Sequence, residues 1–215
     1  MIDDPDSRIR RLVSDALNGA HDLVGRWGRI HHGDRRARRF GHFGVGSIVG
    51  FPTGVVYGER YIHIGSRTLL ADHVTLTAGM IPGQAMVTDP VVRIGDNCMI
   101  GRGNSIVGHF SIDIGDGVFT GTNVYVTDQN HVYEDTSRWI GIQDPVEAPV
   151  GIGDGTWIGS GAVILPGARI GRHVVVAANS VVRGEIPDHS VVAGVPARVV
   201  KTFDIEAGWV RPPTP

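Results

Sequence analysis

The chain has 215 residues, 41% of them hydrophobic, and a formal net charge of −2 at pH 7. This length and composition allow a sizeable core and indicate one main domain. No apolar run reaches the roughly 18 residues that a membrane span needs, and the N-terminal sequence MIDDPDSRIRR lacks the apolar segment of a signal peptide. We therefore expect a cytoplasmic protein without a membrane span. The single cysteine, Cys98, excludes an internal disulfide and stands where the chain needs a small buried side chain.

Residues 1–40 are expected to form an N-terminal arm. A helix is predicted from Asp6 to Val24, and the segment from Arg26 to Arg39 carries six arginines and one acid, Asp34. Such a run is typical of surfaces that bind nucleic acid or an anionic membrane. No nucleic-acid-binding fold or interleaved aromatic residues accompany it, so we expect no nucleic-acid partner. We interpret the run as a solvated arm or as a surface that meets acids of a neighbouring subunit, with an anionic membrane as the alternative.

Aliphatic residues return every six positions through most of the remaining chain. The register includes Ile64, Leu70 and Leu76; Ile94, Ile100 and Ile106; Ile114, Thr120 and Val126; and Ile152, Ile158, Ile164, Ile170, Val176 and Val182. Each period is one short strand with a tight corner, and three periods make one triangular coil with the aliphatic side chains stacked inside. The pattern predicts an all-β solenoid over residues 41–201, because a β-sandwich would not keep this register.

The corners and interruptions of the repeat carry further information. Thirty-one glycines can supply corners, and the Asn and Asp residues of IGDN (94–97) and IGDG (114–117) are expected to adopt left-handed conformations there. The stretches 77–93 and 127–149 break the period and are predicted to be loops that project from the stack, where function usually resides. Residues 202–215 are expected to be an irregular tail.

Three segments resemble the left-handed β-helix acyltransferases: VTDQNH (126–131), VGIGDGTWIGSGAVILPGARIG (150–171) and IPDHSVVAGVPAR (186–198). The similarity extends from about residue 62 to residue 201 and points to the branch of galactoside, maltose and polysaccharide-modifying O-acetyltransferases. It implies a left-handed parallel β-helix, against the usual right-handed crossover, and a homotrimer with active sites between subunits. It also implies acyl transfer from acyl-CoA to a carbohydrate hydroxyl, without a metal. Acetyl-CoA is the expected donor, with succinyl-CoA as the alternative.

The resemblance assigns the catalytic general base to His131. The unperturbed pKa of histidine, about 6.5, suits a group that takes the proton of the attacking hydroxyl and returns it to the leaving thiolate. The second ring nitrogen of such a base needs a partner, and Asp128 and Glu134 are candidates, although Asp128 also fits a turn. The expected acceptor-binding residues are His109, Asn104, Asn130, Glu134 and Trp139, of which Trp139 could equally anchor the loop.

Donor binding is assigned through the same resemblance. Ser160 and Ala178 correspond to positions that contact the pantetheine arm, while Arg183, Arg198 and Lys201 offer positive charge to the nucleotide phosphates. One departure concerns an asparagine that positions the acceptor in the galactoside and maltose enzymes. Gly101 or Gly103 occupies its place here, so we do not expect a galactoside-like acceptor.

Two other functions remain as alternatives. A γ-type carbonic anhydrase shares the solenoid and binds zinc through histidines, which His63, His73, His109 and His131 could nominally supply. Irregular spacing and the AGVPAR ending speak against it. A non-catalytic trimeric scaffold is the second alternative, and an acyltransferase with an amino acid or amino sugar as acceptor also stays open.

Overall fold

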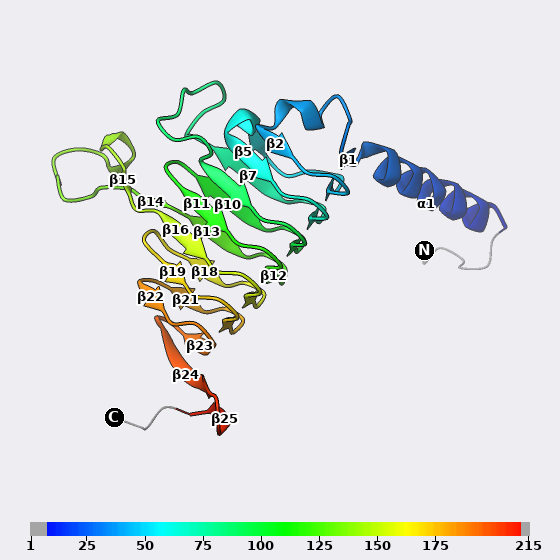
Figure 1. Ribbon diagram of the computed structural model, residues 1–215. Coiled ribbons are helices and arrows are strands. Elements are labelled where there is room, and N and C mark those ends of the chain that lie inside the picture. Colours follow the sequence, from blue (N-terminus) through cyan, green and yellow to red (C-terminus); the bar gives the residue numbers. More distant parts are fainter. Residues whose placement is uncertain (1–7, 212–215) are drawn as a thin grey trace, which may run out of the picture.

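The computed structural model describes residues 8–211, which form mainly short parallel strands wound into a left-handed β-helix (Figure 1). The β-helix is a prism with three flat faces, here called A, B and C, and each coil passes through them in the order A, C, B. Face A contains β1 (Ile30–His31), β3 (Ile48–Val49), β6 (Leu69–Leu70), β9 (Met99–Ile100), β12 (Phe119–Thr120), β17 (Trp157–Ile158), β20 (Val175–Val176), β23 (Ser190–Gly194), β24 (Ala197–Asp204) and β25 (Gly208–Val210). Face C contains β4 (Val56–Tyr57), β7 (Thr75–Ala78), β10 (Ser105–Gly108), β13 (Tyr125–Thr127), β18 (Val163–Ile164) and β21 (Val181–Val182). Face B contains β2 (His42–Phe43), β5 (Ile62–Ile64), β8 (Val92–Ile94), β11 (Ile112–Ile114), β16 (Val150–Ile152), β19 (Arg169–Ile170) and β22 (Glu185–Ile186).

The repeating aliphatic residues fill the interior, as the sequence predicts. Strands of successive coils pair in parallel with matching register, for example Ile94 with Ile114 and Ile152 with Ile170. Every residue of the predicted register is buried, with at most 5% of its surface exposed. Full burial of one such side chain stabilises the fold by roughly 1.5–3 kcal/mol, so the stack is the main source of stability. Cys98 is also buried, and this burial raises the pKa of its thiol.

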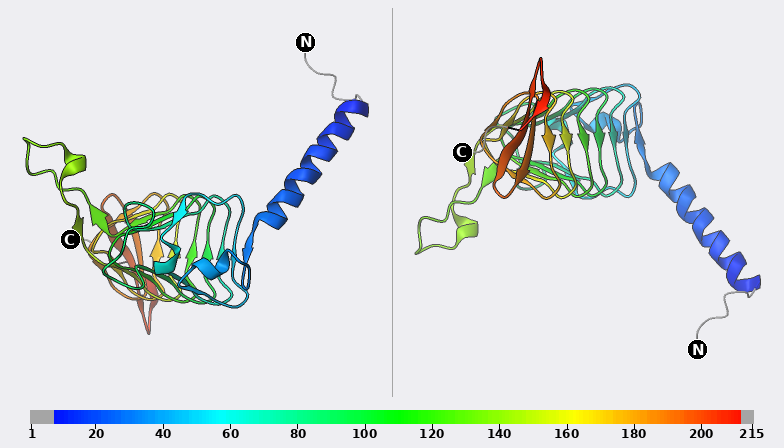
Figure 2. Two further views of the ribbon diagram at one scale, coloured as in Figure 1. Left: turned by 90° about the horizontal axis from the view of Figure 1, so that it is seen from above. Right: turned by 90° about the horizontal axis from the view of Figure 1, so that it is seen from below.

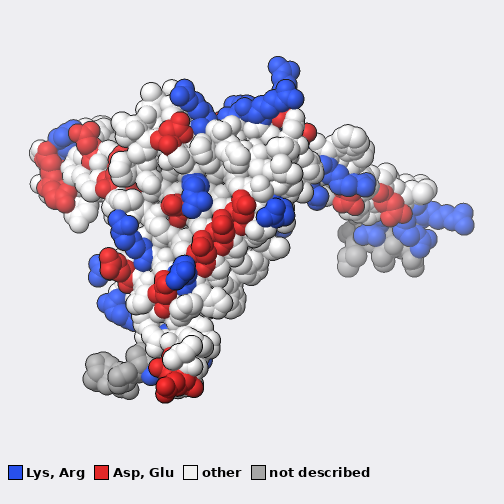
Figure 3. Space-filling view, in the orientation of Figure 1, with Lys and Arg blue, Asp and Glu red and all other residues white. Residues whose placement is uncertain are grey.

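Asparagine and aspartate have different roles at the corners of the coils. Asn97 takes a left-handed conformation with φ of 56°, as expected, and Asn123 does the same at 57°. The expectation was wrong for the aspartates, which have ordinary φ and bind the neighbouring coil instead. The Asp96 carboxylate accepts the backbone N–H of Ser66, and the Asp96 N–H donates to Asp116, each at 2.8 Å. Acidic side chains consequently form a row across the coils (Figure 3).

Both interruptions of the repeat are insertions between face C and face B. The first spans residues 79–91, shorter than expected because the flanking residues join β7 and β8. The second spans residues 128–149 and is partly regular: β14 (Gln129–Asn130) pairs antiparallel with β15 (Val146–Glu147), and a 3-10 turn, η3 (Ile140–Ile142), lies between them. This second insertion extends away from the solenoid in both views of Figure 2.

The N-terminal helix α1 (Arg8–Gly28) ends four residues later than the predicted Val24, and the predicted start at Asp6 lies outside the described residues. It projects from the first coil, on the side away from the second insertion (Figure 2). The residues after it cap the solenoid, because β1 pairs antiparallel with β3, and Ile30 and Phe40 are buried. Two 3-10 turns, η1 (Ala37–Arg39) and η2 (Glu59–Tyr61), complete this end. Within residues 8–211, no helix has the length and apolar character required to cross a membrane.

The expectation of an irregular tail was wrong up to Val210. After the last coil, β24 turns back along β23 and then pairs antiparallel with β25, with Phe203 opposite Trp209. Asp204 stabilises the connecting turn by accepting the backbone N–H groups of Glu206 and Ala207. Residues 212–215 lie outside the described part of the chain.

Candidate functional site

The residues assigned to function lie on two edges of the prism. The edge where face C passes to face B, here called the C–B corner, carries both insertions and His109. The edge where face A passes to face C, the A–C corner, carries Ser160 and Ala178. Strands of face C separate the two corners, because Ser160 precedes β18 whereas His109 follows β10.

Asp128 anchors the C–B corner. It is fully buried, and its carboxylate accepts the backbone N–H groups of His109, Phe110 and Ser111 at 2.8, 2.8 and 2.6 Å. Burial raises the pKa of this carboxyl, against the lowering effect of the three N–H donors. The sequence suggested Asp128 either as a partner of His131 or as a turn residue. The structure gives it a different task, which is to fix the bend that presents His109.

His109 lies at the centre of a polar cluster from four segments. Its Nδ1 contacts Oε1 of Glu147 on β15, and its Nε2 lies 3.4 Å from the amide nitrogen of Gln84 in the first insertion. Only 12% of the His109 side chain is exposed. A proton on Nδ1 therefore faces Glu147, which leaves Nε2 as the acceptor of the Gln84 amide. This arrangement orients an imidazole that can accept a hydrogen bond at Nε2.

Two buried polar atoms beside this cluster lack a hydrogen-bond partner among residues 8–211. They are Oγ1 of Thr77, at the end of face C, and Oε1 of Gln129, on β14. Buried polar groups are normally paired, and each unpaired one costs about 1–3 kcal/mol. The amide nitrogen of Gln129 contacts only the sulfur of Met80 at 3.2 Å. The corner thus holds two buried polar atoms that residues 8–211 leave unpaired.

The remaining loop residues lie on the projecting insertion. His131, Asn130, Glu134 and Trp139 are all exposed, Trp139 to 83%. In the described part of the chain, the imidazole of His131 makes no hydrogen bond or ion pair. Glu134 accepts the backbone N–H of Tyr133 and does not hold the histidine ring. A single chain therefore leaves His131 without the partner that a general base needs.

Asn104 must be removed from the expected acceptor-binding residues. Only 1% of it is exposed, because it points into the solenoid. Its amide nitrogen donates to the hydroxyl of Thr120, and its side-chain oxygen accepts the backbone N–H of Val124 at 2.8 Å. Both polar atoms thus link neighbouring coils, and neither is available to a substrate.

Part of the expected donor site comes together at the A–C corner. Ser160 and Ala178 are exposed on successive coils, and the Asn179 N–H donates to the carbonyl of Ser160 between them. Arg198 continues this edge, since it pairs with Ala193 where β23 reaches the corner. Lys201 lies farther along β24, opposite Val191, and Arg183 follows β21 at the C–B corner. The structure therefore groups three of the five expected donor residues.

Sequence reasoning did not identify Glu147 or Gln84. Glu147 is 38 positions from His109, and only the antiparallel pairing of β14 with β15 brings it there. The alternating pattern around Gln129 and Glu147 is too short to predict such a hairpin from the sequence. Within residues 8–211, no three His, Cys, Asp or Glu side chains form a group that could hold a metal ion.

Comparisons with known proteins agree with the repeat. The model of the bacterial transferase hexapeptide (six repeats) matches residues 149–184, and the hexapeptide repeat of succinyl-transferase matches residues 91–128. The chain is 36% identical to "Probable acetyltransferase Rv3034c" of Mycobacterium tuberculosis, over 66% of this chain and 42% of that protein. It is also 36% identical to galactoside O-acetyltransferase of Escherichia coli, over 53% of this chain and 55% of that one. The chain thus spans about half the length of these curated relatives.

Among solved structures, the acetyltransferase VCA0836 of Vibrio cholerae, crystallised with acetyl coenzyme A, superposes with a TM-score of 0.51 at 26% identity. The alignment covers 79% of this chain and 74% of that one.

Proposed function

We propose that this chain, which matches the bacterial transferase hexapeptide repeat and the hexapeptide repeat of succinyl-transferase, transfers an acyl group from acyl-CoA to a carbohydrate hydroxyl. The observation that carries this proposal is the C–B corner. It combines an imidazole oriented by a carboxylate, two unpartnered polar atoms and a second histidine on the adjoining insertion. Acetyl-CoA is the proposed donor, in line with the acetyl-CoA complex of VCA0836.

In the proposed reaction, His131 acts as general base. The acceptor oxygen attacks the thioester carbonyl carbon while Nε2 or Nδ1 of His131 takes its proton. The tetrahedral intermediate collapses, the carbon–sulfur bond breaks, and the proton returns to the thiolate of coenzyme A. The products are the acyl ester and free CoA, and no covalent enzyme intermediate is needed.

His109 orients the acceptor in this proposal. Its Nε2 is an acceptor held in a fixed direction by Glu147, so it can receive a hydrogen bond from a sugar hydroxyl in place of Gln84. Trp139 on the insertion offers an exposed ring for stacking on a sugar.

We further propose that the enzyme is a homotrimer whose sites form between copies. Within one chain, face C stands between the acceptor residues and the A–C corner with Ser160 and Ala178. The second insertion reaches outward from its own solenoid (Figure 2), and in this proposal it contacts the neighbouring copy. A neighbouring copy would supply the donor corner and would give His131 the surroundings that it lacks.

The test is release of free thiol from acetyl-CoA or succinyl-CoA, with a panel of mono- and oligosaccharides as acceptors. We expect thiol release that requires an acceptor and falls below about 1% of the wild-type rate in His131→Ala. The exposed Asp144→Asn variant, on the same insertion, serves as the control and should retain full activity.

Other outcomes point to other functions. Acceptor-dependent turnover that survives in His131→Ala but not in His109→Ala would transfer the base role to His109. Stoichiometric zinc in the purified protein, with carbon dioxide hydration, would replace the proposal by the carbonic anhydrase alternative. Failure to bind CoA would favour the scaffold.

A further inference from the structure

Helix α1 has one continuous apolar stripe. Its members recur at intervals of three and four residues, which places them on one side of an α-helix. They are Ile9, Leu12, Val13, Ala16, Leu17, Ala20, Leu23, Val24 and Trp27. No residue of the helix is buried, and the exposed fractions of the large side chains run from 49% for Leu23 to 83% for Trp27. Contiguous exposed apolar surface of this kind marks a binding site.

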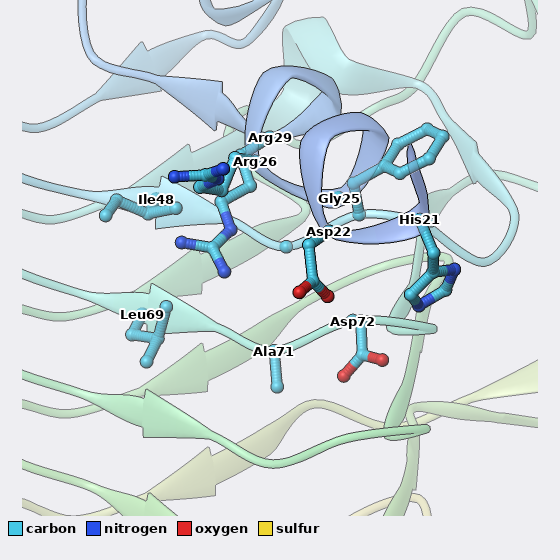
Figure 4. Close-up of a pocket in the computed structure, with 11 residues that line it drawn as sticks. His21, Asp22, Gly25, Arg26, Arg29, Ile48, Leu69, Ala71 and Asp72 are labelled. Atoms are coloured by element: carbon cyan, nitrogen blue, oxygen red, sulfur yellow. The ribbon is translucent and has the colours of Figure 1, made fainter. Parts of the chain in front are cut away.

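The stripe faces away from the protein's own solenoid. The opposite side of the helix, with His21, Asp22 and Arg26, lines a groove of roughly 780 Å³ against Leu69 and Asp72 of the first coils (Figure 4). Because the polar side of α1 is turned toward the solenoid, no other residue between 8 and 211 covers the apolar side in this arrangement. The stripe is therefore open to a partner other than these residues.

A strongly basic segment begins in the last turn of the helix and continues beyond it. Residues 26–39 contain Arg26, Arg29, Arg35, Arg36, Arg38 and Arg39 against the single acid Asp34, a formal charge of +5 in a chain of −2. All six arginines are exposed, and Arg39 also pairs with Glu59 at 3.0 Å. The segment caps the first coil, so its charge gathers at the same end of the solenoid as α1 (Figures 1 and 3).

We propose that α1 and this basic segment dock the protein on the surface of a bilayer that contains anionic lipid. A short amphipathic helix with low overall hydrophobicity lies in the headgroup region with its apolar side in the acyl boundary, where tryptophan and leucine are favoured. Arginines close to the surface add attraction to anionic headgroups. A second copy that packed its own α1 against the stripe would cover it, but α1 carries four arginines against two acids, Asp15 and Asp22, so it would not neutralise the positive charge beside the stripe. The anionic surface accounts for both features.

The test uses full-length protein sedimented with two kinds of vesicle, phosphatidylcholine alone and phosphatidylcholine with phosphatidylglycerol. We expect binding to the anionic vesicles, at least about tenfold weaker binding to the neutral ones, and loss of binding in high salt. Leu23→Asp should weaken binding at least about tenfold, because it places a charge in the apolar stripe. Asn18→Asp adds the same charge on the polar side and should bind within about twofold of the wild type.

The triple variant Arg35→Gln, Arg36→Gln, Arg38→Gln separates the contribution of charge, and we expect at least a tenfold loss on anionic vesicles. Circular dichroism and size-exclusion chromatography establish that each variant keeps the fold. Equal binding of Leu23→Asp and the wild type would overturn the proposal. So would absence of vesicle binding together with a large wild-type oligomer that Leu23→Asp dissociates, because a second copy would then cover the stripe. None of these results depends on acyl transfer.

Discussion

The buried carboxylate of Asp128 gives a quantitative prediction for Asp128→Asn. One oxygen of the carboxylate accepts the N–H groups of Phe110 and Ser111, and the other accepts that of His109. An asparagine can retain the first pair as neutral hydrogen bonds, each weaker by about 1 kcal/mol than a bond to a charged group. Its amide nitrogen then opposes the His109 N–H, a mismatch that costs about 1–3 kcal/mol. Relief from burying a charge offsets part of this loss, and we expect a net destabilisation of about 2–4 kcal/mol at pH 7.

Urea unfolding followed by circular dichroism, at one protein concentration, measures this difference. Asp144→Asn removes the same charge from an exposed position in the same insertion and should change the free energy of unfolding by less than about 0.5 kcal/mol.

The pH dependence of the stability difference between wild type and Asp128→Asn has a definite sign. Because burial raises the folded-state pKa of Asp128, the native protein binds this proton more tightly than the unfolded chain does. The stability that this group contributes is lost as the pH rises through the folded pKa, so the gap between wild type and Asp128→Asn should widen as the pH falls from 7 toward the unfolded-state pKa of about 4. Equal stability of the two proteins would refute the assignment of Asp128 as the anchor of the bend.

Three further predictions concern the cluster, the thiol and the core. His109→Ala should raise the KM for the sugar acceptor at least about tenfold and leave the KM for acyl-CoA unchanged, and Glu147→Gln should show a smaller effect of the same kind in steady-state kinetics. Cys98 should react with a thiol reagent only after unfolding, because its thiol is buried and its pKa raised; rapid labelling of the native protein would contradict this. Ile106→Ala should lower the free energy of unfolding by about 2–5 kcal/mol, and the half-exposed Met99→Ala should cost far less, as measured by urea titration.

The repeating core could be predicted from the sequence because six-residue periodicity is a local property. Each of Ile64, Ile94 and Ile158 carries its own evidence for burial, and the structure agrees at every position of the register. The same holds for Asn97, whose left-handed corner follows from the residue type alone. Aspartate has the same turn preference, but at Asp96 and Asp116 the carboxylates bond to the adjacent coil. That contact depends on stacking, which a single coil does not reveal.

The site was less predictable because its contacts span long separations. Asn104 resembles a surface polar residue in the sequence, yet its two bonds across coils bury it. The tail after Thr202 lacks a repeat and was expected to be irregular, although β24 and β25 complete the sheet edge. Glu147 gains its role only through the hairpin that returns it to His109. Local sequence patterns therefore predicted the solenoid and the positions of its insertions. The polar contacts within the insertions could be identified only in the structure.

The most direct test of the proposed composite site is a mixture of two inactive variants. His131→Ala removes the base, and Ala178→Trp fills the A–C corner where the donor is proposed to bind. The two proteins are unfolded, combined in equal amounts and refolded, and thiol release is then measured with acetyl-CoA and the acceptor. If each site takes His131 from one copy and the A–C corner from the next, about a quarter of the sites will combine two intact halves, and activity should return to about a quarter of the wild-type value. No recovery, from variants that assemble as the wild type does, would mean that both halves come from the same chain and would contradict the composite site.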